Sequence, residues 1–159
     1  MPRRGNVKRK KISPDPVYND VMVTKLINRS MYDGKKSVAE AEVYEAFEIV
    51  KEKTGKDPMK AFHDALEKIR PSMEVRPRRV GGASYQVPMP VRGTRQNSLS
   101  IRWLIEAARG RSNSEYHTYA EKLAAEIVDA VNDEGGAFKK KAEMERMAEA
   151  NRAFAHFRW

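Results

Sequence analysis

The histidines and carboxylates of this chain are not spaced like a catalytic or metal-binding group. His63, His117 and His156 lie far apart, and none belongs to a His-x-x-x-His pair of the kind that binds zinc. The glycine pair at 81–82 lacks the following lysine and helix of a phosphate-binding loop. The glutamates between positions 40 and 52 recur as on a solvated helix face. We therefore expect no enzyme active site, no metal and no cofactor.

The chemistry that the sequence does offer is phosphate binding by two basic segments. Residues 1–11 carry a net charge of +6 and residues 70–111 a net charge of +7, whereas the rest of the chain carries −4. Segments of one sign favour binding to a polyanion, and nucleic acid is the usual one. The cations of the first segment are Arg3, Arg4, Lys8, Arg9, Lys10 and Lys11.

The second basic segment uses arginine and no lysine. Guanidinium groups bind phosphate bidentately and stack on bases, which ammonium groups do not do in the same way. Charges on strand edges can also block aggregation, and a basic tail can also serve solubility or targeting. The number of arginines favours a phosphate-binding surface. They are Arg70, Arg76, Arg78, Arg79, Arg92, Arg95, Arg102, Arg109 and Arg111.

Some residues leave two interpretations open. Lys35 and Lys36, beside Gly34, could bind phosphate or could be ordinary turn residues. Tyr85 could stack on a base or could pack across its own pair of strands. Trp103 lies among apolar positions, so we expect it in the core.

Apolar residues at helical spacing dominate the chain and predict about six helices. Asn19 or Asp20 can cap the first helix, and Ser37-Val38-Ala39-Glu40 has the pattern of a capping box. The last helix is predicted to carry Lys139, Lys140 and Lys141 in its first turn, where cations oppose the helix dipole and an anionic partner would offset the cost. The predicted helices span about 20–31, 37–54, 58–70, 94–108 and 115–131, and the last begins near 138.

Residues 73–91 follow a different period and predict a β-hairpin. Apolar and polar residues alternate on both sides of the turn signal at 81–82. Pro77, Pro88 and Pro90 exclude a central position in a sheet, and a two-stranded ribbon alone is marginal in water. We therefore predict a mainly α fold: a bundle of about six helices with one projecting two-stranded β-hairpin arm that rests on another molecule.

Length and composition favour one domain. With 159 residues, of which 40% are hydrophobic, the chain can bury a substantial core. Residues 1–17 are predicted to be a flexible basic tail that orders on a partner. Residues 18–159 then form a single helical RNA-binding domain that includes the arm. The chain has no cysteine, no signal-peptide pattern and no run of about 20 apolar residues, so we expect a soluble intracellular protein.

Several stretches, in the same order along the chain, resemble the bacterial small-subunit ribosomal protein S-seven family. The resemblance extends over nearly all of the sequence and is weakest in the tail and at 110–115. The stretches are Asp33-Gly34-Lys35-Lys36, Arg78-Arg79-Val80-Gly81-Gly82, Tyr85-Gln86-Val87-Pro88, Ile101-Arg102-Trp103 and residues 146–156.

The resemblance implies a non-catalytic structural protein of the small ribosomal subunit, located in the cytoplasm. Such proteins bind the 3′ major domain of the ribosomal RNA (rRNA) and help to start assembly of the subunit head. The hairpin would lie near the exit-site transfer RNA and the messenger RNA path. The S-nine and S-eleven proteins would be neighbours, and neither a membrane nor a small-molecule substrate is implied.

The resemblance also assigns residues by position. The rRNA surface would comprise the basic residues of the tail, Lys35, Lys36, Arg76, Arg78, Arg92, Arg95 and Arg102. The hairpin tip that faces transfer RNA would comprise Arg79, Gly81, Gly82, Ser84 and Tyr85. Charge adds Arg109, Arg111 and Lys139 to Lys141 as rRNA-binding candidates. Pro90 and Gln96 depart from the family pattern, in which an acidic residue and a second arginine are common.

Two other classes of protein share some of these features. A DNA-bending architectural protein also combines helices with a basic, proline-containing β-arm, but it usually forms a symmetric dimer. A protein-interaction module could dock through the aromatic C-terminus and use its charge for solubility. Monomeric behaviour would argue against the first class, and a main complex that resists high salt would favour the second.

Overall fold

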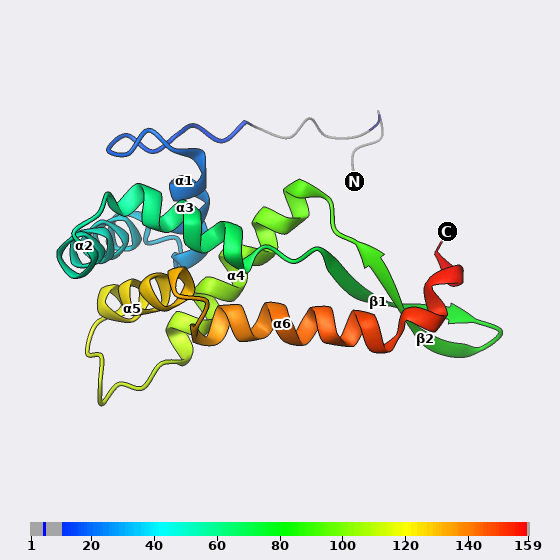
Figure 1. Ribbon diagram of the computed structural model, residues 1–159. Coiled ribbons are helices and arrows are strands. Elements are labelled where there is room, and N and C mark those ends of the chain that lie inside the picture. Colours follow the sequence, from blue (N-terminus) through cyan, green and yellow to red (C-terminus); the bar gives the residue numbers. More distant parts are fainter. Residues whose placement is uncertain (1–4, 6–10, 159) are drawn as a thin grey trace.

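Six α-helices, one β-hairpin and a short C-terminal 3-10 helix make up a computed structural model that describes Gly5 and residues 11–158 (Figure 1). The mainly α fold with one hairpin is confirmed. The elements are α1 (Val21–Ser30), α2 (Lys36–Thr54), α3 (Pro58–Ile69), β1 (Met73–Val80), β2 (Ala83–Pro90), α4 (Gly93–Gly110), α5 (Tyr119–Val131), α6 (Gly135–Ala150) and η1 (Arg152–Phe157).

Helices α1 to α5 form the body, and α5 packs against α2, α3 and α4. Phe47, Phe62 and Leu123 are fully buried in the shared core. Trp103 is only 5% exposed, which confirms its predicted place there. Figure 1 shows α6, in orange, running from the body toward the hairpin. A helix of 16 residues is about 24 Å long, so α6 connects the body to the arm, and it packs on both.

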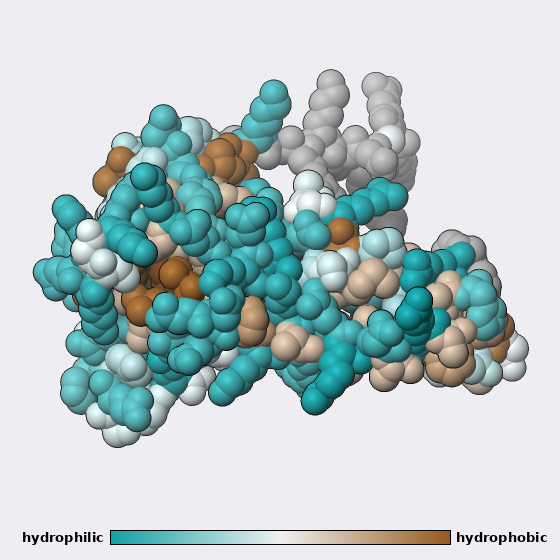
Figure 2. Space-filling model, in the orientation of Figure 1, coloured by the Kyte–Doolittle hydropathy of each residue, from teal (hydrophilic) through white to brown (hydrophobic). Residues whose placement is uncertain are grey.

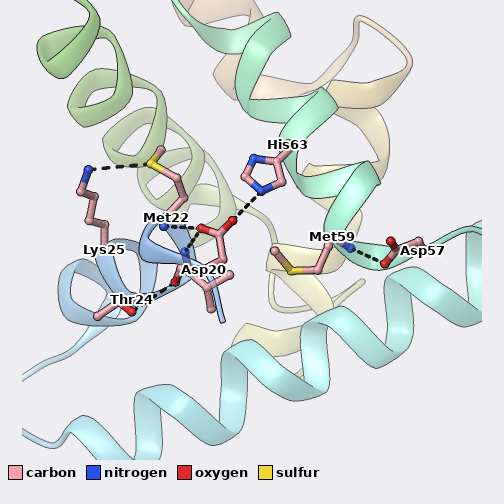
Figure 3. A network of polar contacts seen from close by, with 8 residues as sticks. Asp20, Met22, Thr24, Lys25, Asp57, Met59 and His63 are labelled. Atoms are coloured by element: carbon pink, nitrogen blue, oxygen red, sulfur yellow. Dashed lines mark hydrogen bonds and ion pairs between the residues drawn. The ribbon is translucent and has the colours of Figure 1, made fainter. Parts of the chain in front are cut away.

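Aspartates cap two helices of the body, as predicted. The Asp20 side chain accepts hydrogen bonds from the backbone N–H groups of Met22 and Val23 at the start of α1. Figure 3 shows His63, from α3, pointing at the same carboxylate, with Nε2 2.7 Å from Asp20 Oδ2. Asp57 caps α3 through Met59 N at 3.1 Å. The Asp20 carboxylate therefore joins the start of α1 to α3.

Two predicted helix starts are wrong. Helix α2 already begins at Lys36, so Ser37 lies inside the helix and forms no capping box. Helix α5 begins at Tyr119 and not near 115, because Thr118 and Glu121 form the capping box that starts it. The Thr118 side chain accepts from Glu121 N at 3.2 Å, and Glu121 accepts in return from Thr118 N at 3.3 Å. The hydrogen bonds that the Glu121 carboxylate accepts from His117 N and, to a smaller extent, from Thr118 N hold the pKa of Glu121 below its ordinary value.

The start of α6 also differs from the prediction. The helix begins at Gly135, so Lys139 to Lys141 lie in its second turn, and their predicted conflict with the helix dipole does not arise. The N-terminus of α6 instead meets the carboxylate of Glu126, which accepts from Ala137 N at 2.8 Å. A Cβ at Gly135 would lie 2.8 Å from Glu126 Oε1, and Gly135 has a φ of +88°. Glycine is therefore required where α5 and α6 meet.

Glu126 is also the main partner of Arg111. Its carboxylate is almost fully buried, and Oε2 accepts from Arg111 Nε at 2.9 Å and from Nη2 at 2.6 Å. Asp129 pairs with the same guanidinium. Burial lowers the pKa of Arg111, but the hydrogen bonds to Asp129 and Glu126 outweigh it and raise the pKa above its ordinary value. This cluster links the end of α4 to α5 and to the start of α6.

The segment before α1 is attached to the body by a buried aspartate. Asp15 is 3% exposed and accepts from Val17 N, Tyr18 N and the hydroxyl of Tyr44, the last at 2.8 Å. Burial and the hydrogen bond to Asp15 raise the pKa of Tyr44 to about 12. Thr24 Oγ1 donates to Ser13 O at 3.0 Å. Part of the predicted tail, from Ser13 onward, is therefore fixed on α1 and α2.

Replacing Glu126 with glutamine is expected to lower the free energy of unfolding by about 3 kcal/mol, because it breaks a buried ion pair. Glutamine keeps an acceptor for Ala137 N, so the loss would report the ion pair. Urea unfolding followed by circular dichroism measures it. The control is Glu52→Gln on the exposed side of α2, for which we expect a change within about 0.5 kcal/mol. Equal stability of the two variants would contradict a structural role for Glu126.

Candidate nucleic-acid interface

A cavity of about 610 Å³ opens between α1, the segment before it and the start of α4. Among the residues that the structure describes, its lining contains two cations and no acidic residue. Lys25 and Arg29 lie four residues apart and so share one face of α1. Their spacing was visible in the sequence, but neither was predicted as a site residue. The lining residues are Ile12, Lys25, Asn28, Arg29, Thr94, Ser98 and Ile101.

The start of α4 adds predicted arginines near this cavity. Arg92 precedes the first turn of the helix. Arg95 and Arg102 lie seven residues apart, which is about two turns, so they share the face that carries Ser98. Lys11 is exposed and adjoins Ile12. Arg3, Arg4, Lys8, Arg9 and Lys10 lie outside the described residues. The cavity thus brings α1, α4 and the end of the tail to one basic surface.

Glu74 fixes the base of the arm. Its side chain is 5% exposed and pairs with Arg76 on the same strand and with Arg95 on α4, where Nε lies 2.8 Å from Oε2. One carboxylate therefore holds two predicted rRNA-binding arginines at the junction of arm and body. Both remain nearly half exposed, so each can still meet a phosphate.

The arm has the predicted hairpin geometry. Strands β1 and β2 pair antiparallel, with Arg78 opposite Tyr85 and Arg79 opposite Ser84. Gly81 and Gly82 have φ values of +58° and +90°. Two-residue hairpin turns favour such values, which residues other than glycine rarely adopt. The tip residues Arg79, Gly81 and Gly82, together with Ser84, are therefore presented at the end of the ribbon that lies farther from the body (Figure 1).

The C-terminal helix η1 packs along β2. The Tyr85 ring lies 5.3 Å from that of Phe154 and 5.2 Å from that of Phe157. Arg158 Nε donates to Pro88 O at 2.7 Å. The contact between the aromatic C-terminus and the arm was not predicted from the sequence, although the spacing of Phe154 and Phe157 by three residues places them on one side of a helix. Tyr85 thus packs on η1, a contact that neither earlier interpretation included.

Four of the remaining basic candidates contact other groups of the protein. Arg111 is held between Glu126 and Asp129, with 17% of its side chain exposed, so the protein itself compensates its charge. Lys36 pairs with Glu40 at 3.2 Å and Lys140 with Glu143 at 3.6 Å. Lys141 donates to Lys68 O at 2.8 Å. Lys35 and Lys139 are exposed.

The described residues contain no group of three or more histidines and carboxylates that could hold a metal ion. His63 contacts Asp20, whereas His156 contacts a backbone carbonyl of η1. No helix in the described part of the chain is long and apolar enough to cross a membrane. Figure 2 shows a largely hydrophilic face on which hydrophobic residues form small separate groups.

Replacing Phe154 with alanine is expected to loosen the arm without unfolding the body. Amide hydrogen exchange in β2 should accelerate by about 2- to 13-fold, because aromatic pairs contribute roughly 0.5–1.5 kcal/mol. Mass spectrometry of peptides spanning 83–90 measures it. The matched control is Phe138→Ala, which removes a half-buried ring near the other end of α6. Unchanged exchange in β2 of the Phe154 variant would show that η1 does not hold the arm.

Comparison with known proteins gives one consistent result. The family model described as Ribosomal protein S7p/S5e matches residues 2–152. The chain is similar to the small ribosomal subunit protein uS7 of Caldicellulosiruptor saccharolyticus, with 62% identity, and to those of Thermoanaerobacter sp. and Sulfurihydrogenibium sp., with 58% and 57%. Each alignment covers 100% of both chains. The chain therefore belongs to the ribosomal protein S7p/S5e family of structural, non-enzymatic proteins of the small ribosomal subunit.

Proposed function

We propose that the chain binds the 3′ major domain of small-subunit rRNA and helps to start assembly of the subunit head. The observation that carries the proposal is the basic surface around the cavity between α1 and α4, whose described lining residues include no acid. Phosphates could approach Lys25 and Arg29 from one side and Arg92 and Arg95 from the other. A polyanion that follows this surface would also meet the end of the basic tail at Lys11.

The fold supplies a rigid platform for such binding. The two helices that line the cavity pack directly on each other, and Asp15 and Ser13 fix the segment that leads to the tail. Binding to a preorganised surface loses less conformational freedom than binding to a mobile one. In this mechanism the protein neutralises phosphates and matches the shape of one RNA fold. Few base-specific contacts are needed to stabilise that fold.

The arm supports the second part of the proposal. We infer that the tip, from Arg79 to Tyr85, lies near the exit-site transfer RNA and the messenger RNA path, and that the S-nine and S-eleven proteins are neighbours. The observation that supports this inference is the narrow ribbon with arginines near its end. Glu74 fixes the ribbon to the body, and Tyr85 packs it on η1. A fixed arm can reach a neighbouring RNA without losing its orientation.

The two departures from the family pattern have places in this geometry. Gln96 Nε2 donates to Pro71 O at 3.1 Å, so it ties α4 to the segment before β1. Pro90 ends β2 opposite Met73. We propose that Gln96 exchanges a contact with RNA for a contact within the protein, and that Pro90 leaves the arm with one negative charge fewer.

Binding to a 3′ major-domain fragment, compared with unrelated RNA and with duplex DNA of equal length, tests the proposal. We expect nanomolar binding to the fragment and strong preference over both competitors. The logarithm of the binding constant should fall with the logarithm of salt concentration, by about 0.7 to 0.9 per phosphate contact. Filter binding at several salt concentrations measures both. Equal binding to all three nucleic acids, or salt-independent binding, would refute the proposal.

The triple variant Arg76→Ala, Arg78→Ala, Arg79→Ala is expected to weaken binding to the fragment while its circular dichroism spectrum stays helical. The salt slope should fall by about 1 for each phosphate contact that is lost. The matched control is Lys51→Ala, Lys53→Ala, Lys60→Ala, which removes the same charge from exposed positions on α2 and α3. Equal losses in both variants would mean that net charge, and not the arm, sets the affinity.

A further inference from the structure

A second, smaller cavity lies on another part of the body, between the turn before α2, the end of α4 and the start of α5. Its volume is about 270 Å³, close to the lower end for small-molecule sites, about 300 Å³. It thus has the size for one planar ring system. Its lining consists mainly of rings and aliphatic groups: Ser30, Tyr32, Lys35, Val38, Ala39, Glu42, Arg109 and Tyr119.

Tyr32 and Arg109 form a stacked pair in this lining. The Arg109 guanidinium carbon lies 4.1 Å from the centroid of the Tyr32 ring, and Nη2 donates to Ser30 O at 2.9 Å. The guanidinium is therefore held in place from two directions. Tyr32 is nevertheless 64% exposed, and Val38 beside it is 57% exposed. Large apolar groups that remain this exposed in one place mark a binding surface.

We propose that this cavity binds a single unstacked nucleobase of RNA. The base stacks on the Tyr32 ring, beside the guanidinium of Arg109. We call the cavity the base pocket. The inference rests on the proposed function, because it names a contact that the same RNA would make on a different part of the body. Stacking on tyrosine and on arginine planes is the usual way in which proteins hold unpaired bases.

The Glu42 carboxylate offsets part of the positive charge that Lys35 and Arg109 bring to the pocket. Glu42 is one of the lining residues, and its Oε2 accepts from Ala120 N at 3.0 Å. A carboxylate in the lining disfavours a phosphate inside. Lys35 is exposed and also contributes to the lining, so a phosphate attached to the base could pair with it. The arrangement thus separates an aromatic interior from a cationic edge, as a nucleotide requires.

Two of the hydroxyl groups at the pocket are paired with each other. Tyr119 Oη and Ser30 Oγ lie 3.0 Å apart and hydrogen-bond to each other. Burial raises the pKa of Tyr119, so its phenol stays neutral near pH 7. Since the hydroxyls of Tyr119 and Ser30 are paired with each other and Glu42 accepts from the backbone, the pocket offers mainly ring faces and aliphatic surface to a ligand. We therefore expect it to accept different bases with little discrimination.

Titration of the full chain with adenosine 5′-monophosphate (AMP), followed by amide chemical shifts in NMR, tests the pocket without rRNA. We expect saturable shifts at Tyr32, Val38 and Ala39. Ribose 5-phosphate, which has the phosphate but no base, should not cause them. Equal shifts with ribose 5-phosphate would show a phosphate site only, and no saturable shifts with AMP at millimolar concentration would also overturn the proposal.

Binding of variants to the 3′ major-domain fragment tests the pocket in the complex. We expect Tyr32→Ala to weaken binding by about 5- to 160-fold, the range for loss of one stacked base, while Tyr32→Phe stays close to the parent chain. The control Val17→Ala changes another exposed apolar residue, 63% exposed and outside the pocket lining. Thermal unfolding checks that each variant folds.

The outcomes separate the two proposals. If the parent chain does not prefer the fragment, the proposed function fails, and the AMP titration alone then decides whether the pocket binds a base. If the parent chain prefers the fragment but Tyr32→Ala binds as tightly, the proposed function holds and the base pocket is refuted. If Tyr32→Phe loses as much affinity as Tyr32→Ala, the hydroxyl and not the ring makes the contact, which also refutes stacking.

Discussion

The buried carboxylate of Glu126 joins three helices, and the position of the arm depends on this junction. It stands on α5, receives the guanidinium of Arg111 from the end of α4, and accepts from Ala137 N at the start of α6. Unpaired, such a buried charge would be strongly unfavourable, and its partners turn it into a fixed junction of three helices. Because α6 runs from this junction to the hairpin, the orientation of the arm relative to the body depends on it.

The arm shows how a two-stranded ribbon can be stable without a larger sheet. A ribbon of this kind is marginal when alone in water, and the protein supports it at two places. Glu74 ties its base to Arg95 on α4, whereas η1 covers β2 through the rings around Tyr85. From the sequence alone, the arm is predicted to rest on another molecule. The C-terminus of the same chain provides part of that support, so the free protein already holds the arm in one orientation.

Local patterns predicted the fold well, because helix spacing, proline and glycine act over a few residues. The hairpin turn at Gly81 and Gly82 and the cap at Asp20 are examples. The errors have the same origin. Tyr116 continues the apolar spacing of α5, but the capping box of Thr118 begins the helix later. The partners of Arg111 and Arg95 lie 15 to 21 residues away along the chain, so only the fold could show that these arginines are paired.

These ion pairs reduce the number of arginines whose charge is fully available to RNA. A count of arginines treats each as available to RNA, yet Arg111 is held by two carboxylates, and Arg76 and Arg95 share one. Lys25 and Arg29, which lie outside the two basic segments of the sequence, line a cavity to which the described part of the chain contributes no acidic residue. The attraction that each part of the surface exerts on a polyanion therefore depends on the carboxylates near its cations as well as on the number of arginines. By this criterion α1, which seemed only a core helix in the sequence, contributes as directly as α4 to the basic surface.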